Sequence, residues 1–206
     1  MRAPLTRFAR DDTGTTTIEF TIVALLFFLM TFGLVEFGYM LFQWNSATKA
    51  VQLGARLAAV SDPVWTGLPG LTDSGTPGGP WTTAYNVTCV GSGGGSCSTS
   101  GYDSTAMQRL VYGRGSTTCG VIDVDGDPGM CDIFDRVTPA NISVNYRNTG
   151  LGFAGRPGGP VPTITLRLTG LTFQFFALGD LLGLGPVTMP DFKVTMTGED
   201  LSAAAP

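Results

Sequence analysis

The chain has 206 residues, no histidine and a formal net charge of −4. The lack of histidine excludes Ser-His-Asp and Cys-His catalytic sites, and it removes the commonest metal ligand. No run of Lys or Arg follows the first ten residues, which argues against nucleic-acid binding. We expect a protein that is not an enzyme and does not bind nucleic acid.

The first predicted element is a long apolar helix. Residues 20–35 carry no charge, and no proline occurs between Thr15 and Asp62. One helix over residues 15–60 is therefore predicted, ended by Pro63. Its residues from about 18 to 42 are enough to cross about 30 Å of hydrocarbon.

The charges before this helix predict its orientation. Arg2, Arg7 and Arg10 precede the apolar run, and basic residues stay on the cytoplasmic side of a membrane. A single-pass inner-membrane protein is predicted, with its N-terminus in the cytoplasm and its C-terminal domain in the periplasm. A cleaved secretory signal, an uncleaved signal anchor and a leader cut before the apolar run are three alternatives that the charges alone leave open.

The stretch GTTTIEF at residues 14–20 favours the third alternative. A glycine, four residues, a glutamate and an unbroken apolar helix resemble the processing site of type IV pilins. This resemblance implies that a prepilin peptidase cuts after Gly14, so that residues 1–14 are a leader and Thr15 becomes the N-terminus. It also implies that Glu19 neutralises the new amine of an adjacent subunit. A glutamate that is merely favoured by the helix dipole is the simpler alternative.

A second motif narrows the family. The stretch FGLVEFGYMLFQWNSATKAVQLGARLAAV at residues 32–60 resembles TadE-like proteins, which are pilin-like components of tight-adherence (Flp-type) pilus systems. The resemblance implies assembly through the N-terminal helix, and we take Glu19, Phe20 and Glu36 as the assembly residues. The implied partners are other pilin-like subunits, the prepilin peptidase and the inner-membrane assembly platform.

The outer half of the helix carries a stripe of small residues. Ala47, Ala50, Gly54 and Ala58 recur at three- and four-residue spacing, which places them on one face. The stripe faces either the chain's own outer domain or another subunit. Glu36 has no cation within a dozen residues beyond it, so we expect an intermolecular partner or the membrane interface to satisfy its carboxylate.

Short elements follow in the outer region, residues 61–206. Residues 61–101 are rich in Gly, Pro, Ser and Thr and are predicted to be mostly loop, with a strand at 81–90. A short helix is predicted over 103–113, capped by Asp103 or Ser104. Alternating apolar residues predict antiparallel strands with one covered face, at 142–147, 163–168 and 192–197. The apolar segment 171–185 is predicted to be core or a covering element; an exposed patch for a partner is the alternative.

Four cysteines, Cys89, Cys97, Cys119 and Cys131, all follow the apolar helix. None forms a Cys-x-x-Cys pair, so two disulfides in an oxidising compartment are favoured over zinc. Of the three possible pairings, the local one (Cys89 with Cys97, Cys119 with Cys131) is the one we favour.

No cofactor is expected, with one alternative. Asp123, Asp125 and Asp127 have the 1-3-5 spacing of calcium loops, and Asp132 lies nearby. Pro128 and Phe134 occupy the positions where such loops have glycine and glutamate, so a solvated acidic turn is favoured over a calcium site.

The predicted protein is α+β: a long N-terminal pilin-like transmembrane helix, then a small Gly-rich, mainly antiparallel β domain with disulfides. We expect a minor subunit of a tight-adherence pilus that assembles into the fibre or primes it, supports surface attachment and, once assembled, lies outside the cell. The rival hypothesis is a bitopic envelope protein whose outer domain binds calcium or a protein partner without entering a fibre.

Overall fold

The computed structural model describes residues 13–120, 127–157, 159–176, 179, 183, 185–199 and 201. These residues fall into two compact units. The first contains the chain up to Phe42 together with Gln174–Pro186, and the second contains Gln43–Phe173 and the chain from Val187 onward.

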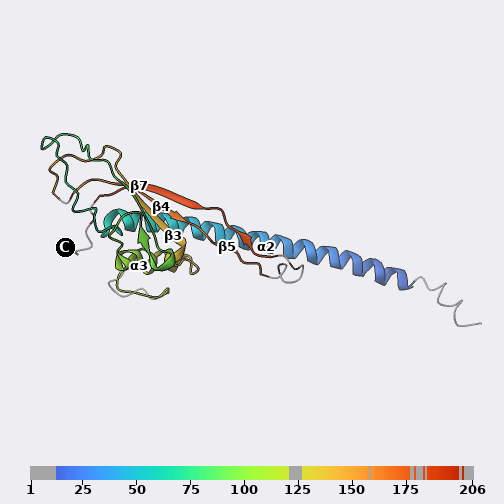
Figure 1. The fold of residues 1–206 in the computed structure, drawn as a ribbon. Coiled ribbons are helices and arrows are strands. Elements are labelled where there is room, and N and C mark those ends of the chain that lie inside the picture. The colour runs from blue at the N-terminus through green and yellow to red at the C-terminus, as the bar shows by residue number, and fades with distance from the viewer. Residues whose placement is uncertain are drawn as a thin grey trace, which may run out of the picture. The chain divides into compact units, whose positions relative to one another are not determined.

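The long helix α2 spans Thr13–Val60 and is the first element in Figure 1. The predicted helix over residues 15–60 is confirmed, and it ends at Val60, before Pro63, as expected from the proline. In the first unit, α2 exposes its large apolar side chains as far as Phe42.

In the second unit, a five-stranded antiparallel sheet has the order β2-β1-β3-β4-β7. Its strands are β1 (Asn86–Val90), β2 (Ser96–Cys97), β3 (Ile142–Arg147), β4 (Thr163–Leu168) and β7 (Phe192–Thr197). The sequence-predicted bounds of the last three strands are confirmed. The strand predicted at 81–90 begins only at Asn86, because Trp81 is buried as a single anchor and its indole N–H donates to the carbonyl of Thr83.

The remaining elements are short. They are α3 (Ser104–Tyr112), α4 (Met130–Ile133), the 3-10 turns η1 (Ser92–Gly94) and η2 (Pro139–Asn141), and a two-stranded ribbon of β5 (Thr172–Phe173) and β6 (Val187–Thr188). The predicted cap of α3 is confirmed: the carboxylate of Asp103 accepts from the backbone N–H groups of Thr105 and Ala106.

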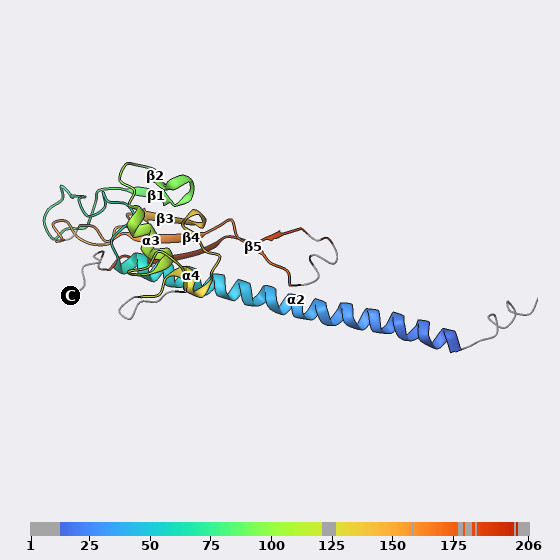
Figure 2. The ribbon, with the colours of Figure 1, turned by 90° about the horizontal axis from the view of Figure 1, so that it is seen from below.

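The small-residue stripe of α2 belongs to the core of the second unit. Ala47, Ala50 and Ala58 are buried, and an added Cβ at Gly54 would lie 2.3 Å from the sulfur of Met130. Of the two alternatives left by the sequence, the stripe therefore faces the chain's own outer domain. The last turns of α2 lie beside the sheet in both views (Figures 1 and 2).

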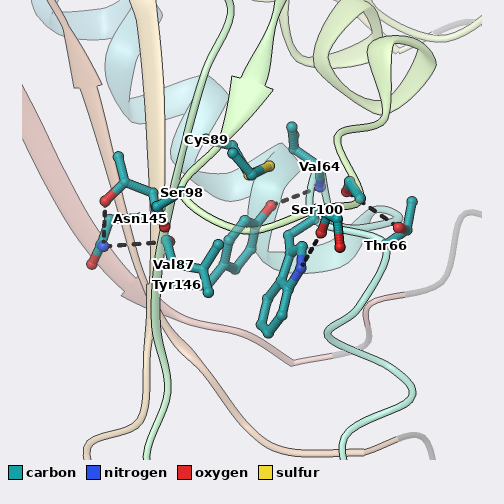
Figure 3. The surroundings of a disulfide bond; sticks show 12 residues. Val64, Thr66, Val87, Cys89, Ser98, Ser100, Asn145 and Tyr146 are labelled. Carbon is teal, nitrogen blue, oxygen red and sulfur yellow. Dashed lines mark hydrogen bonds between the residues drawn. A yellow bond between two sulfur atoms is a disulfide. The ribbon is translucent and has the colours of Figure 1, made fainter.

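Polar contacts hold the part of α2 in the second unit at its beginning, at Gln43, and just after its end, at Val64. The guanidinium of Arg136 donates to Gln43 at 2.9 Å and to Thr172 at 3.1 Å. After the helix, the backbone N–H of Val64 donates to the hydroxyl of Tyr146 at 2.9 Å (Figure 3). Burial raises the pKa of Tyr146, so this hydroxyl stays protonated at neutral pH.

The apolar segment 171–185 is only partly core. Leu171 and Phe173 are buried, but Phe176 is 72% exposed. The prediction that this segment is core or a covering element therefore holds for its beginning and is wrong at Phe176. Most of residues 177–184 lie outside the described part of the chain.

Candidate assembly site

The first half of α2 presents an apolar surface on all sides. Between Ile18 and Phe42 most large apolar side chains are exposed, for example Phe20 at 73%, Leu26 at 61% and Met30 at 69%. Monomeric soluble proteins rarely expose apolar patches of this extent, and a helix that is apolar all round is typical of a membrane span. Within the described residues, α2 is one helix long and apolar enough to cross a membrane.

The two exposed threonines in this stretch are compatible with lipid. The hydroxyls of Thr21 and Thr31 each donate to the carbonyl four residues earlier, those of Thr17 and Phe27, at 2.8 Å. A hydroxyl bonded in this way leaves no donor without a partner in hydrocarbon. These two hydroxyls therefore do not interrupt the apolar surface.

The predicted processing residues lie at the start of the helix. Gly14 and Thr15 are in the first turn of α2, and residues 1–12, most of the predicted leader, lie outside the described residues. Glu19 is exposed, and it makes no ion pair or hydrogen bond with any residue that the structure describes. The carboxylate of Glu19 is thus open to a group from another chain.

Glu36 has a different environment. Its side chain is only 5% exposed, and its Oε2 accepts a 2.8 Å hydrogen bond from the backbone N–H of Phe176. Both residues belong to the first unit. The sequence-based expectation that only another molecule or the interface satisfies Glu36 was wrong, because a segment 140 residues away supplies a donor. Its role in assembly stays a prediction.

Residues 14–56 match the family model TadE, described as TadE-like protein. This segment of the chain is TadE-like. The match begins at the glycine of the predicted cut and ends within α2, so it covers the apolar surface, Glu19 and Glu36. No curated protein and no solved structure matches the chain.

The TadE-like match supports a protein associated with tight-adherence pili. Among the described residues, the exposed apolar helix within the TadE-like segment has the length and composition of a single membrane anchor. The sheet domain lies beyond this segment, so the family match says nothing about its role.

Beyond the TadE-like segment, the described members of the acidic cluster show no metal geometry. Asp123 and Asp125 lie outside the described residues. Asp132 uses both carboxylate oxygens on the backbone, accepting from Gly120 and Gly129 at 2.7 Å each, and Asp127 lies 3.9 Å from Arg114. No group of three His, Cys, Asp or Glu side chains placed to hold a metal occurs among the described residues. A calcium site stays a prediction.

The four cysteines form two disulfides, Cys89–Cys97 and Cys119–Cys131. The first joins β1 to β2, where the two cysteines are direct partners in the ladder. The second ties the loop at residue 119 to α4. The structure thus has the local one of the three pairings, and both bonds lie outside the TadE-like segment.

Proposed function

We propose that the chain is a minor pilin-like subunit of a tight-adherence pilus, held in the inner membrane by the first half of α2 before it enters or primes the fibre. The observation that carries this proposal is the all-round apolar surface that begins beside Glu19 within the TadE-like match. Such a surface suits lipid before assembly and a bundle of like helices afterwards.

Glu19 supplies the assembly contact in this proposal. Cleavage after Gly14 creates an α-amino group at Thr15, and a carboxylate in a membrane environment is stabilised by pairing with a cation. Glu19 is exposed and has no partner among the described residues, so its carboxylate is available to the amine of a neighbouring subunit. Phe20, also exposed, would pack in the same helix bundle.

The disulfides support the proposed topology. Disulfides persist in the periplasm and outside the cell, but they are rare in the cytoplasm. Both bonds lie C-terminal to the membrane helix, and three arginines precede it. A cytoplasmic N-terminus and a periplasmic sheet domain satisfy both observations.

The minor role is inferred from the size of the sheet domain, and the contribution to surface attachment is inferred from the resemblance to tight-adherence systems. The major pilins of tight-adherence systems are short, whereas this chain adds residues 61–206 after the helix. In this proposal the peptidase and the inner-membrane assembly platform act on the TadE-like segment, and the sheet domain projects from the fibre.

The test is incorporation into sheared pili, followed by immunoblotting of cell and fibre fractions. Gly14→Ala and Glu19→Gln should each lower the amount in the fibre at least tenfold. Thr16→Ala and Glu199→Gln, matched changes at exposed positions, should leave it unchanged. Unchanged fibre levels in both test variants would contradict the proposal and favour a bitopic envelope protein that stays in the membrane.

A further inference from the structure

The open face of the five-stranded sheet is almost entirely polar. Successive residues of a strand point to opposite faces, and Figure 3 shows Asn145 and Tyr146 on opposite sides of β3. Tyr146 is fully buried, whereas Asn145 lies on the open face. Apart from Val90, the side chains on this face of β1, β3, β4 and β7 carry hydroxyl, amide or cationic groups.

The charges that the strands place on this face are all positive. Arg147, Arg167 and Lys193 are exposed, and none of them makes an ion pair with any residue that the structure describes. No acidic residue occurs within β1, β3, β4 or β7; Asp191 directly precedes β7 and is likewise unpaired among the described residues. A protein with a net charge of −4 thus keeps three cations without an ion pair on one face, with Asp191 at its edge.

Two of these cations lie directly opposite each other. Arg167 of β4 and Lys193 of β7 are partners in the ladder. Like charges in direct cross-strand register destabilise a sheet. A costly local arrangement without internal compensation is typical of a functional site, and here it suits a ligand that places negative charge between the two side chains.

The row between the cations is held in place by hydrogen bonds. The hydroxyls of Thr165 and Thr195 are 2.9 Å apart, and the amide of Asn145 donates to Thr88, also at 2.9 Å. The face is hollowed here, with a volume of about 440 Å³ bordered by Thr88, Arg147 and Arg167 among others. Ordered hydroxyls and amides in a shallow hollow are suited to hydrogen bonding with a hydroxylated ligand.

The composition of the face restricts the class of ligand. It has no aromatic ring on which a base could stack and no apolar centre of the kind that protein interfaces bury. Arg147 lies two rows from the Arg167–Lys193 pair, about 14 Å along the strands at 3.4 Å per residue. Cations separated in this way suit an extended polyanion with repeated negative groups better than one small anion.

We propose that the open sheet face binds an anionic polysaccharide, with Arg167 and Lys193 on one carboxylate or sulfate group and Arg147 on another further along the polymer. The Thr and Asn row between them would bind sugar hydroxyls. This activity belongs to the sheet domain alone and does not depend on processing at Gly14 or on entry into a fibre.

The test measures binding of the purified full-length protein in nanodiscs to immobilised polymers. The probes are polygalacturonate (carboxylate), heparin (sulfate), neutral dextran and duplex DNA. We expect binding to polygalacturonate, to heparin or to both, weakened by added salt, and none to dextran. Binding to only one of the two anionic polysaccharides identifies the anionic group and supports the proposal.

The matched variants each remove two exposed cations. Arg167→Gln with Lys193→Gln should lower the affinity at least tenfold without lowering the melting temperature, because the variant also removes a like-charge pair. The control variant Lys49→Gln with Arg56→Gln, at exposed positions of α2, should change the affinity less than twofold. No binding to either anionic polysaccharide at low salt, an equal loss in the control pair, or tighter binding to duplex DNA would overturn the proposal.

Discussion

The backbone N–H of Phe176 donates a 2.8 Å hydrogen bond to the carboxylate of Glu36, across 140 residues of sequence. Glu36 is buried, and Phe176 is largely exposed. The helix from Ile18 to Val35 contains eighteen residues and is about 27 Å long, so a hydrocarbon layer entered at Ile18 would end near Glu36. A returning segment of the chain is therefore hydrogen-bonded to α2 at Glu36.

Removing this acceptor should release the returning segment. In Glu36→Ala, the amide of Phe176 should exchange with deuterium at least tenfold faster in nanodiscs, because an amide hydrogen bond to a charged group contributes about 1.5–3 kcal/mol. Glu36→Gln keeps a side-chain oxygen and should give an intermediate rate. Glu19→Ala, about 25 Å away along the helix, is the control and should leave the rate unchanged. Equal exchange in Glu36→Ala and the parent protein would show that this contact does not hold the segment.

The close approach of Gly54 to Met130 predicts a destabilising methyl group. An added Cβ at Gly54 would meet the sulfur of Met130 at 2.3 Å, so Gly54→Ala should cost about 1–3 kcal/mol of unfolding free energy. Gly38→Ala is the matched helix variant, because nothing lies within 4 Å of its Cβ, and it should be neutral or stabilising by up to about 1 kcal/mol. Denaturant unfolding of the full chain in detergent compares the two. If this contact causes the loss, the double variant Gly54→Ala with Met130→Ala should lose less unfolding free energy than the sum of the losses in the two single variants.

The carboxylate of Asp73 should titrate well below its ordinary range. Its oxygens accept hydrogen bonds from the backbone N–H groups of Thr82, Gly75 and Thr83 and from the Thr82 hydroxyl. These bonds, of which the one from the Thr82 backbone has the largest effect, lower the pKa of Asp73 from 3.8 to about 2. Because the folded-state pKa is depressed, the stabilisation is complete above about pH 4 and is lost as the pH falls through about 2. The amide resonance of Thr82 should shift with a midpoint near pH 2.

Two variants test the cause of this shift. Asp73→Asn should abolish the titration of the Thr82 resonance. Thr82→Val keeps the backbone donor and removes only the hydroxyl, so its midpoint should stay below 3.8. A midpoint near 3.8 in the parent protein would mean that the loop between residues 73 and 83 does not close on Asp73 in solution.

The disulfides make a prediction about both connectivity and stability. Peptide mapping without reductant should recover Cys89 with Cys97 and Cys119 with Cys131. The bonded cysteines are 8 residues apart in the first disulfide and 12 residues apart in the second. By the loss of chain entropy in the unfolded state, each bond should stabilise the fold by about 2–3 kcal/mol. Cys89→Ala with Cys97→Ala should therefore lower the melting temperature of the sheet domain by several degrees, which calorimetry measures. Recovery of any crossed peptide pair would contradict the connectivity.

Local sequence patterns predicted the regular elements well. The alternation of β3 and β4 marks their bounds because one face is covered and the other is open, and Pro63 marks the end of α2 because proline cannot continue a helix. Trp81 was misassigned to a strand because its apolar, β-prone surroundings resemble one, although its burial is that of a loop anchor.

Contacts that depend on tertiary folding could not be read from the sequence. Neither hydropathy nor spacing shows that Phe176 returns to Glu36, or that Arg136 joins Gln43 to Thr172. The cross-strand pair of Arg167 with Lys193 depends on the register of two strands separated by more than twenty residues. By contrast, the glycine and glutamate of the TadE-like segment are neighbours in sequence, so the candidate assembly site could be predicted before the fold was known.

Glu19 can pair with an amine at Thr15 only if the chain is cut after Gly14, and intact-mass spectrometry of the protein from its native membrane shows where the chain begins. We expect a chain that begins at Thr15 in the parent protein and at Met1 when the prepilin peptidase gene is deleted. A chain that begins at Met1 in both strains would contradict it, because the amine that Glu19 is proposed to bind would then not exist.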